Sequence, residues 1–497
     1  MSDLLYRSTR GGDGPITASK AILQGLAKDG GLFVPEKLPK LPVSLKSLAG
    51  ADYREVAYIV MKEFLTDFTE EELKNCIEKA YDDKFDVKEL VPIKKVGGAY
   101  HLELFHGATI AFKDMALSIL PYFMVTALKK NNIGKEIVIL TATSGDTGKA
   151  ALAGFADVPG TKIIVFYPKD GVSKIQELQM VTQKGDNTAV VGIRGNFDDA
   201  QTGVKELFSD RALTAQMDAA GLQFSSANSI NIGRLVPQVV YYTYAYTTLL
   251  ARGEIKEGEK INVCVPTGNF GNILAAYYAR AMGVPIAKFI CASNENKVLF
   301  DFFETGVYDK NREFKVTSSP SMDILVSSNL ERLIYSCVGE DAAKCKELMD
   351  SLKSCGRYEI SKDAYAKLSD FFGGYADEAA TAARIKEIYE KEGYVMDTHT
   401  AVASKVYADY VNRTGDDTKT VLASTASPYK FLTAVLESIG ELKCDPSDEF
   451  AKVEELHKVT GVEIPGAVKE LMGAPVRHTR VCDPDKMKEE VLDILGI

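Results

Sequence analysis

The chain has 497 residues, which is more than a single hydrophobic core usually supports, so we expect two or three domains. Hydrophobic residues make up 46% of the sequence and charged residues 26%, as is ordinary for a soluble globular protein. The formal net charge of −10 argues against nucleic acid or an anionic membrane as a partner, because their phosphates would be repelled. A small anionic substrate is still allowed, since a cleft can concentrate a few cations.

Targeting, disulfide and metal signals are weak. The amino-terminal run MSDLLYRSTRGGDG lacks the cationic and apolar regions of a signal peptide, and no stretch is long and apolar enough to span a bilayer. The eight cysteines are scattered without a C-x-x-C pair, and there are only five histidines. The sequence therefore predicts neither a disulfide scaffold nor a metal site, and it favours a cytoplasmic location.

The first hundred residues predict a mainly helical lobe, with helical spacing over 52–65 and 69–81. From about residue 136 onward, predicted strands alternate with predicted helices. Buried strands are predicted over 136–141, 162–167, 188–193, 261–265 and 286–291, and helices over 149–155, 173–183 and 198–208. Continuous apolar strands separated by helices are typical of a parallel sheet covered on both faces. A last strand is expected over 420–424, with a helix start near Pro428.

A lysine stands in the segment ELFHGATIAFKD, which covers residues 103–114. Lys113 follows apolar residues on a segment that would pack into the protein. Burial or a second nearby cation lowers the pKa of a lysine, and the neutral amine can form a Schiff base with an aldehyde. Read alone, Lys113 is more often an ordinary surface lysine.

A glycine-rich loop, Gly268 to Asn272, follows the predicted strand at 261–265. Glycines let backbone N–H groups approach an anion, and the amino terminus of the following helix adds a favourable dipole. This chemistry suits a phosphate. The alternative is a tight strand-to-helix turn that binds nothing. The loop is not the G-x-G-x-x-G fingerprint of dinucleotide-binding proteins.

A second turn, TSGDTG at residues 143–148, follows another strand. A P-loop needs a glycine where this chain has Thr143 and a Ser or Thr where it has Ala150, so a nucleotide loop is excluded. Ser144 and Thr147 offer hydroxyls at a helix start, which suits a substrate carboxylate. Either residue could instead serve only as a helix N-cap.

The segment SSANSINIGRLVPQ contains Arg234, whose guanidinium could grip a phosphate at two points. A single arginine near a helix end is more often a structural cap or ion-pair partner. A lone histidine is likewise more often structural, so His399 beside Asp397 is not expected in the site.

These motifs together resemble the fold-type II family of pyridoxal-phosphate enzymes, and within it the threonine synthase family. The resemblance extends from YRSTRG at residue 6 and DGGLFVP at residue 29, through the segments above and PTGNFGN, to Ser424-Thr425-Ala426. Two positions depart from the family pattern: Ala108 and Thr398 stand where proline is usual. Neither change removes a reactive group, so they concern loop geometry.

The resemblance implies two doubly wound parallel-sheet domains and an amino-terminal lobe over 1–95. The large cofactor domain would comprise 96–140 and 255–497, with a helical insertion near 341–392, and the small substrate domain would comprise 141–254. It also implies pyridoxal 5′-phosphate as cofactor and roles for fourteen residues. Lys113 would be the catalytic and cofactor-linked lysine. Cofactor contacts would come from Phe112, Asp146, Gly268, Asn269, Phe270, Gly271, Asn272 and Thr425, and substrate contacts from Ser144, Thr147, Asn228, Ser229 and Arg234.

The implied reaction converts O-phospho-L-homoserine and water to L-threonine and phosphate, with Lys113 as general base and Thr425 beside the pyridine nitrogen. A monomer is expected rather than a dimer. Three alternatives stay open: another fold-type II lyase, such as a serine or threonine dehydratase or a cysteine synthase; a silent ligand-binding relative; and, least favoured, a nucleotide-binding protein. The charge state of Asp146 cannot be read from the sequence.

Overall fold

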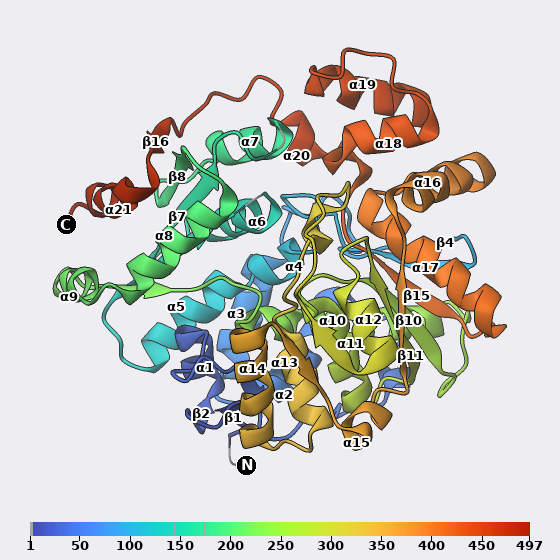
Figure 1. The fold of residues 1–497 in the computed structure, drawn as a ribbon, viewed down its shortest axis with the longest axis horizontal. Helices are drawn as coiled ribbons and strands as arrows, with labels where there is room; N and C mark the ends of the chain where they lie inside the picture. Colours follow the sequence, from blue (N-terminus) through green and yellow to red (C-terminus); the bar gives the residue numbers. More distant parts are fainter. Residues whose placement is uncertain (1–2, 144, 173) are drawn as a thin grey trace.

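The computed structural model describes residues 3–143, 145–172 and 174–497. Figure 1 shows two main sheets, each with helices around it, and a smaller lobe near the amino terminus. Ser144 and Ser173 lie outside the described residues, so the prediction for Ser144 is not addressed by the structure.

The amino-terminal lobe combines helices with a small antiparallel sheet. β1 (Leu5–Ser8) lies between β2 (Ile16–Thr17) and β3 (Phe33–Pro35). The two predicted helices are α2 (Tyr53–Phe64) and α3 (Glu70–Ala80). Thr69 caps α3 in a capping box with Glu72, which explains why this helix begins where the sequence predicts. The three strands were not predicted because each is only two to four residues long.

The five-stranded sheet has the order β16-β8-β7-β6-β9, and all its strands are parallel. The strands are β6 (Glu136–Ala142), β7 (Thr161–Pro168), β8 (Thr188–Ile193), β9 (Leu222–Ser225) and β16 (Arg480–Cys482). The helices connecting β6 to β9 are α6 (Asp146–Phe155), α7 (Lys174–Val181), α8 (Phe197–Ser209) and α9 (Arg211–Ala219). The predicted strands and helices of this region are confirmed, with ends that differ by a few residues.

The six-stranded sheet has the order β14-β11-β10-β15-β5-β4, and only the β4–β5 pair is antiparallel. The strands are β4 (Ile93–Val96), β5 (Ala99–Glu103), β10 (Ile261–Pro266), β11 (Ile286–Ser293), β14 (Phe371–Tyr375) and β15 (Thr420–Ser424). Helices α11 (Gly271–Met282) and α17 (Thr398–Thr414) pack against it, and α10 (Ile232–Ala251) packs on α11.

The remaining elements complete the layers and the surface. They are α1 (Ala18–Gln24), η1 (Leu45–Leu48), α4 (Asp114–Leu117), α5 (Leu120–Lys130), α12 (Val298–Thr305), β12 (Val307–Asp309), η2 (Pro320–Met322), α13 (Leu330–Cys337), α14 (Ala342–Cys355), β13 (Arg357–Glu359), α15 (Lys362–Ala366), α16 (Glu378–Glu392), η3 (Pro428–Lys430), α18 (Leu432–Ile439), α19 (Glu449–Thr460), α20 (Gly466–Lys469), η4 (Pro484–Lys486) and α21 (Met487–Leu495). In the described part of the chain, no helix is both long and apolar enough to cross a membrane.

The sheets differ from the expected organisation in three places. The expected boundary at 140/141 falls inside β6, and β16, near the carboxyl end, pairs with β8 in the five-stranded sheet. The segment 341–392 is not purely helical, because β14 pairs with β11 as an edge strand of the six-stranded sheet. β14 contains two glycines, which weaken a strand pattern in the sequence. A Cβ at Gly374 would lie 2.4 Å from Val406 of α17, so this glycine lets the helix pack closely on the strand.

Candidate active site

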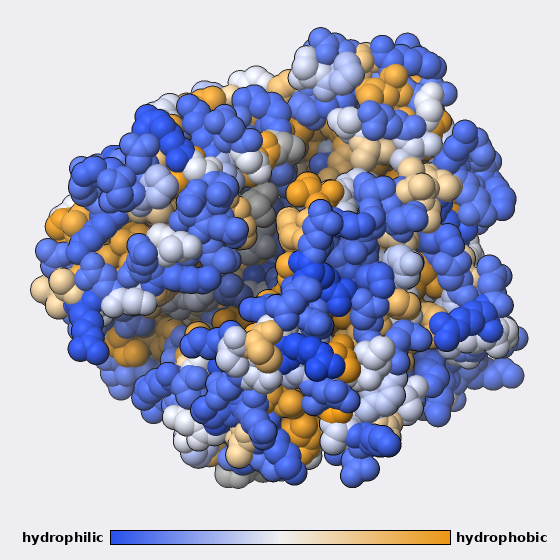
Figure 2. All heavy atoms as spheres, viewed as in Figure 1, coloured by the Kyte–Doolittle hydropathy of each residue, from blue (hydrophilic) through white to orange (hydrophobic). Residues whose placement is uncertain are grey.

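The predicted motifs follow the carboxyl ends of parallel strands. The turn at 143–148 follows β6, the glycine loop follows β10, Thr425 follows β15, and the segment that carries Lys113 follows β5. In open α/β sheets, ligands bind outside this edge. The face drawn in Figure 2 is mainly hydrophilic, and it is hollowed between the part that carries α6–α8 and the part that carries α10–α12.

Lys113 lies immediately before α4 and is 9% exposed. Its Nζ donates a hydrogen bond to Ser321 Oγ at 3.3 Å and lies 3.5 Å from Asp146 Oδ2. The neighbouring Phe112 N–H donates to the Thr425 carbonyl at 2.8 Å, which ties this segment to the end of β15. The structure thus brings together Lys113, Phe112, Asp146 and Thr425, which come from three distant parts of the chain.

The loop before Lys113 is closed by a buried carboxylate. Asp114 accepts hydrogen bonds from the Thr109 N–H at 2.8 Å and from the Thr109 hydroxyl at 2.5 Å. A Cβ at Gly107 would lie 2.6 Å from Asp114 Cβ, so only glycine fits there. These contacts fix the loop although Ala108 stands where proline is usual.

Asp146 has a partner that the sequence did not indicate. Lys430 of η3 is buried, and its Nζ lies 3.0 Å from Asp146 Oδ1 while donating to the Thr109 carbonyl at 2.8 Å. Burial alone would raise the pKa of Asp146, but the positive charges of Lys430 and Lys113 outweigh it and hold the pKa well below its ordinary value. Asp146 is therefore a carboxylate in this structure.

The pKa of Lys113 is lowered, chiefly by burial. Asp146 acts in the opposite direction, whereas the charges of Lys430 and Arg234 lower the pKa further. A lysine amine with a lowered pKa is more often neutral at a given pH, which is the form that attacks an aldehyde or removes a proton.

His399 lies closer to this cluster than expected. Its Nε2 accepts from the Ser321 N–H at 3.1 Å, so its proton is on Nδ1, which donates to Asp397 Oδ2 at 2.8 Å. The histidine thus holds the backbone of Ser321, whose hydroxyl lies between Lys113 and Asp146. Thr398, where proline is usual, donates to the Ser318 carbonyl at 2.7 Å and ties α17 to the same loop.

The glycine loop leads into the start of α11, where no side-chain cap is found among the residues that the structure describes. Phe270, with φ 66°, is the N-cap and makes no side-chain capping bond, so the first N–H groups of the helix lack that partner. Asn272 Oδ1 accepts from Tyr241 at 2.7 Å and from Tyr242 at 2.5 Å, while its buried Nδ2 has no partner among the described residues. Orphaned donors at a helix amino terminus fit a bound phosphate.

Arg234 lies in the first turn of α10, follows the buried Ile232 and Gly233, and is 4% exposed. Its Nη1 donates to the Ala227 carbonyl at 2.9 Å, and its buried Nε has no partner among the residues described. No carboxylate among the described residues forms an ion pair with Arg234. Burial lowers the pKa of its guanidinium to about 10. A buried guanidinium without a counter-charge fits an anion site.

Asn329 links the two predicted phosphate sites. Its N–H donates to the Asn269 carbonyl at 3.0 Å, and its side-chain amide donates to the Ser229 carbonyl at 3.3 Å. Ser229 and the exposed Asn228 therefore lie beside the glycine loop. No pattern in the sequence points to Asn329, because it stands far from both motifs in the chain.

The turn at 143–148 depends on a threonine that was not predicted as a site residue. The Thr143 hydroxyl accepts from the N–H groups of Gly145 and Gly148, each at 3.0 Å. A Cβ at Gly148 would lie 2.4 Å from the Thr143 methyl group. Thr147 is half-buried on the first turn of α6, next to Asp146.

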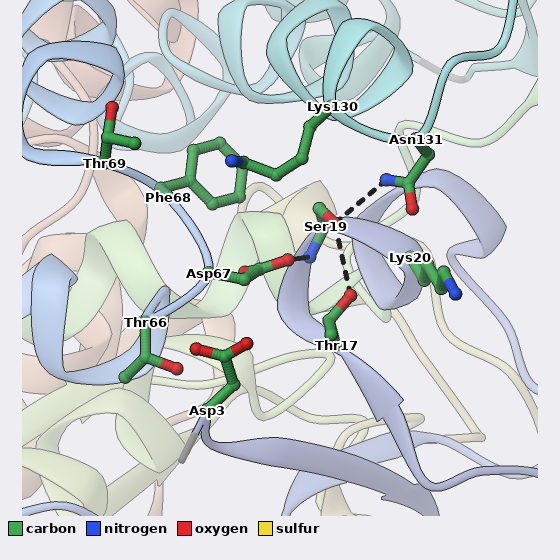
Figure 3. A pocket seen from close by; sticks show the side chains of 10 residues that line it. All are labelled: Asp3, Thr17, Ser19, Lys20, Thr66, Asp67, Phe68, Thr69, Lys130 and Asn131. Carbon is green, nitrogen blue, oxygen red and sulfur yellow. Dashed lines mark hydrogen bonds between the residues drawn. The ribbon is translucent and has the colours of Figure 1, made fainter. Parts of the chain in front are cut away.

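A separate polar pocket of about 520 Å³ lies in the amino-terminal region, beside α1 and α5. Figure 3 shows Ser19 at its centre, accepting from the Asn131 side chain at 3.0 Å and donating through its N–H to Asp67 at 3.2 Å. None of the described site residues lines it. It is not part of the cluster around Lys113.

Three family models match successive parts of the chain: threonine synthase N terminus over residues 5–81, pyridoxal-phosphate dependent enzyme over 90–425, and threonine synthase, C-terminal, over 400–491. Threonine synthase of Methylobacillus glycogenes is 35% identical over 473 residues, which cover 92% of this chain and 94% of that protein. The chain belongs to the threonine synthase family. The resemblance and the fold class predicted from the motifs are confirmed, as is the family's dependence on pyridoxal phosphate.

Other relatives extend the comparison. The crystal structure of the pyridoxal-phosphate-bound threonine synthase from Brucella melitensis has a TM-score of 0.88 and 34% identity, with full coverage of both chains. Proteins named threonine synthase-like 1 from Macaca fascicularis and Homo sapiens are 42% identical over 435 residues. These matches cover 85% of this chain, which spans only 58% of the length of those two proteins.

Proposed function

We propose that the chain converts O-phospho-L-homoserine and water to L-threonine and phosphate with pyridoxal 5′-phosphate as cofactor. The observation that carries this proposal is the buried Arg234, which has no carboxylate partner in the described part of the chain and adjoins a cationic cluster. A site for a substrate with its own phosphate needs such a charge, whereas a dehydratase substrate brings no phosphate.

The described residues fit the cofactor. When bound, pyridoxal phosphate withdraws electrons from the carbon atoms beside the substrate amine. Lys113 would hold the cofactor, Asp146 would lie beside its ring, and Thr425 would face the ring nitrogen. The loop Gly268 to Asn272 (Gly268, Asn269, Phe270, Gly271, Asn272) would bind its phosphate through N–H groups at the start of α11 and the unpartnered Asn272 amide.

The amine of Lys113 would move the protons of the reaction. Its burial and the cations around it lower its pKa, so Nζ can accept a proton from the substrate and later return it. Burial also keeps bulk water from this atom. Ser144 and Thr147 would bind the substrate carboxylate, and Asn228 and Ser229 would join Arg234 at the substrate phosphate.

The test is a paired assay on the full chain with pyridoxal phosphate. We expect equimolar inorganic phosphate and threonine from O-phospho-L-homoserine. Borohydride reduction followed by digestion and mass spectrometry should find the cofactor on Lys113, and Lys113→Ala should abolish turnover. Release of 2-oxo acid from serine or threonine, without phosphate release from phosphohomoserine, would favour a dehydratase instead.

Several broader expectations belong to the same proposal. We propose the lobe at 1–95 and the two α/β domains predicted above, with β6 and β16 assigned to the small one and α10, which packs on α11, assigned to the large one. The partner would be the small anionic substrate, not nucleic acid or a membrane, and the chain would act as a monomer in the cytoplasm. Sedimentation of the purified protein tests the oligomeric state.

A further inference from the structure

The carboxylate nearest to Lys113 is shared with a second amine. Asp146 Oδ2 lies 3.5 Å from Lys113 Nζ, and Asp146 Oδ1 lies 3.0 Å from Lys430 Nζ. The three side chains are 6%, 10% and 0% exposed for Asp146, Lys113 and Lys430 respectively, so water screens these charges little. An amine that holds this carboxylate more firmly also holds its own proton more firmly.

Lys430 is fixed to the segment that carries Lys113. Its Nζ donates to the Thr109 carbonyl at 2.8 Å, and the Ser427 N–H, at the start of η3, donates to the Ile110 carbonyl at 3.0 Å. Asp146 comes from α6, beside the other sheet. The two lysines are therefore held at a fixed distance from each other, and the Asp146 carboxylate approaches them from the side of the five-stranded sheet.

We propose that Lys430 is the second cation of the site, a positioning residue that takes one oxygen of Asp146 and thereby leaves Lys113 able to give up its proton. This inference rests on the proposed role of Lys113 as the cofactor lysine. A neighbouring cation is one of the known ways to activate a lysine amine, and here the same cation also draws the counter-charge away.

Other charged groups around Lys113 also influence its pKa or that of its neighbours. Arg234 of α10 also lowers the pKa of Lys113, after burial and Lys430. His399 of α17 accepts a hydrogen bond at Nε2 from the Ser321 N–H. The charge of Lys430 also lowers the pKa of Lys149, one turn after Asp146 on α6, and acts to lower that of the buried Asp114 of α4. Among the residues that the structure describes, Asp146 is thus the one carboxylate that opposes activation of Lys113 directly.

The test follows attachment of pyridoxal phosphate to the full-length chain after its cofactor has been removed. Samples at a series of pH values are reduced with borohydride at intervals, and mass spectrometry measures the rate of attachment to Lys113. Lys430→Met should move the midpoint of the rate–pH curve upward by about one unit or more, which is about a tenfold slower attachment below the midpoint. Lys430→Arg keeps the charge and should stay near the wild type.

A charge-removal comparison separates this role from a structural one. Asp146→Asn removes the anion and should move the midpoint downward, and the double variant Lys430→Met/Asp146→Asn should return it toward the wild type. A purely structural role would lower attachment at every pH without moving the midpoint. Lys452→Met is the matched control, because Lys452 is equally buried but pairs with Glu449 on α19.

An unmoved midpoint in folded Lys430→Met would overturn the proposal. If that variant does not fold, Lys430→Gln, which can still donate to the Thr109 carbonyl, replaces it with the same expected shift. If the wild type carried no cofactor mass on Lys113 at any pH, both proposals would be rejected together. A chain that carries the cofactor on Lys113 but acts as a dehydratase would reject the proposed reaction and leave the role of Lys430 intact.

Discussion

At the scale of single residues, the role of Arg234 can be tested by comparison with a second buried arginine, Arg332, whose surroundings differ. Arg332 of α13 is also buried, but its guanidinium donates to the carbonyls of Phe33 and Ile230 and to the Asn329 side chain. Arg234 has one such bond, to Ala227, and a buried Nε without a partner among the described residues. A satisfied arginine stabilises the fold, whereas an unpaired one is costly until an anion arrives.

We expect Arg234→Met to leave the melting temperature of the ligand-free chain unchanged or raised, and to lower kcat/KM for phosphohomoserine by roughly thirty-fold to several thousand-fold. The range follows from about 2–5 kcal/mol for truncating one partner of a buried charge pair, at about 1.4 kcal/mol per tenfold. Arg332→Met should instead lower the melting temperature. Equal losses for phosphorylated and unphosphorylated substrates in a folded Arg234 variant would reject the phosphate assignment.

Lys149 predicts a dependence of stability on pH. It is buried, its Nζ donates to Gln183 Oε1 at 2.6 Å, and it forms no ion pair within the described ranges. Burial, aided by Lys430, lowers its pKa from 10.5 to about 7. Between these values the unfolded chain carries a proton that the folded chain lacks, so the free energy of unfolding rises with pH in this window.

Lys149→Met should remove this contribution. We expect the melting temperature of the variant to exceed that of the wild type most at pH values below about 7, where Lys149 must be charged inside the fold, and the excess should shrink as the pH approaches about 10. Calorimetry at several pH values measures it. A difference in melting temperature that does not change with pH would mean that Lys149 has the same charge in the folded and unfolded chains.

The sequence identified the reactive groups better than their partners. Lys113, Asp146, Arg234 and Asn272 stand in motifs whose spacing carries chemistry, so they could be chosen in advance. Lys430 and Ser321 could not, because each is an ordinary residue in a loop, and only the strand order brings it to Lys113. The roles of the chosen residues stay predictions until ligands are measured.

At the scale of elements, the close contact between the glycine loop and η2 depends on Gly268. A Cβ there would lie 2.5 Å from the Ser321 carbonyl oxygen, which is backbone and cannot turn aside. The backbone of Gly268 does not have a positive φ, so only the lack of space forbids a side chain. The glycine therefore sets the distance between the glycine loop and Ser321, the residue that contacts Lys113.

Gly268→Ala should lower the affinity of the full chain for pyridoxal phosphate by about tenfold or more and reduce thermal stability, since overpacking costs about 1–3 kcal/mol. A fluorescence titration and a melting curve measure the two effects. Gly134→Ala is the matched control, because a Cβ at Gly134 would meet no described atom within 4 Å and the φ of this glycine is not positive. Normal cofactor affinity in Gly268→Ala would show that the loops can separate without consequence.

Long apolar strands were the elements that sequence reasoning found most accurately. β8 and β15 begin and end where predicted, because each is a mainly buried run with turn residues on both sides. β14 and β16 were missed for physical reasons. Glycines interrupt β14, and the three-residue β16 exists only because the chain returns to pair with β8.

At the scale of the whole molecule, the candidate site lies where the five-stranded and six-stranded sheets meet. α10 begins next to β9 of the five-stranded sheet, yet its body packs on α2 and α11 beside the other sheet. Arg234 and the glycine loop therefore belong to one packed unit. The turn at 143–148 and Asp146 approach from the other unit, and the ion pair of Asp146 with Lys430 bridges the two.

This arrangement predicts that a ligand bound on both sides draws the units together. Lys113 and Arg234 are buried here, so a substrate reaches them only when the units separate, and its carboxylate and phosphate would then hold α6 and α10 at one distance. An unreactive phosphonate analogue of phosphohomoserine should therefore reduce the radius of gyration, slow proteolysis, and slow amide exchange in α6 and α7. Inorganic phosphate at saturation is the control, because it can fill only the Arg234 side. If the analogue at saturation changed neither scattering nor exchange, or if phosphate alone gave the full effect, closure across the junction would be the wrong description of substrate binding.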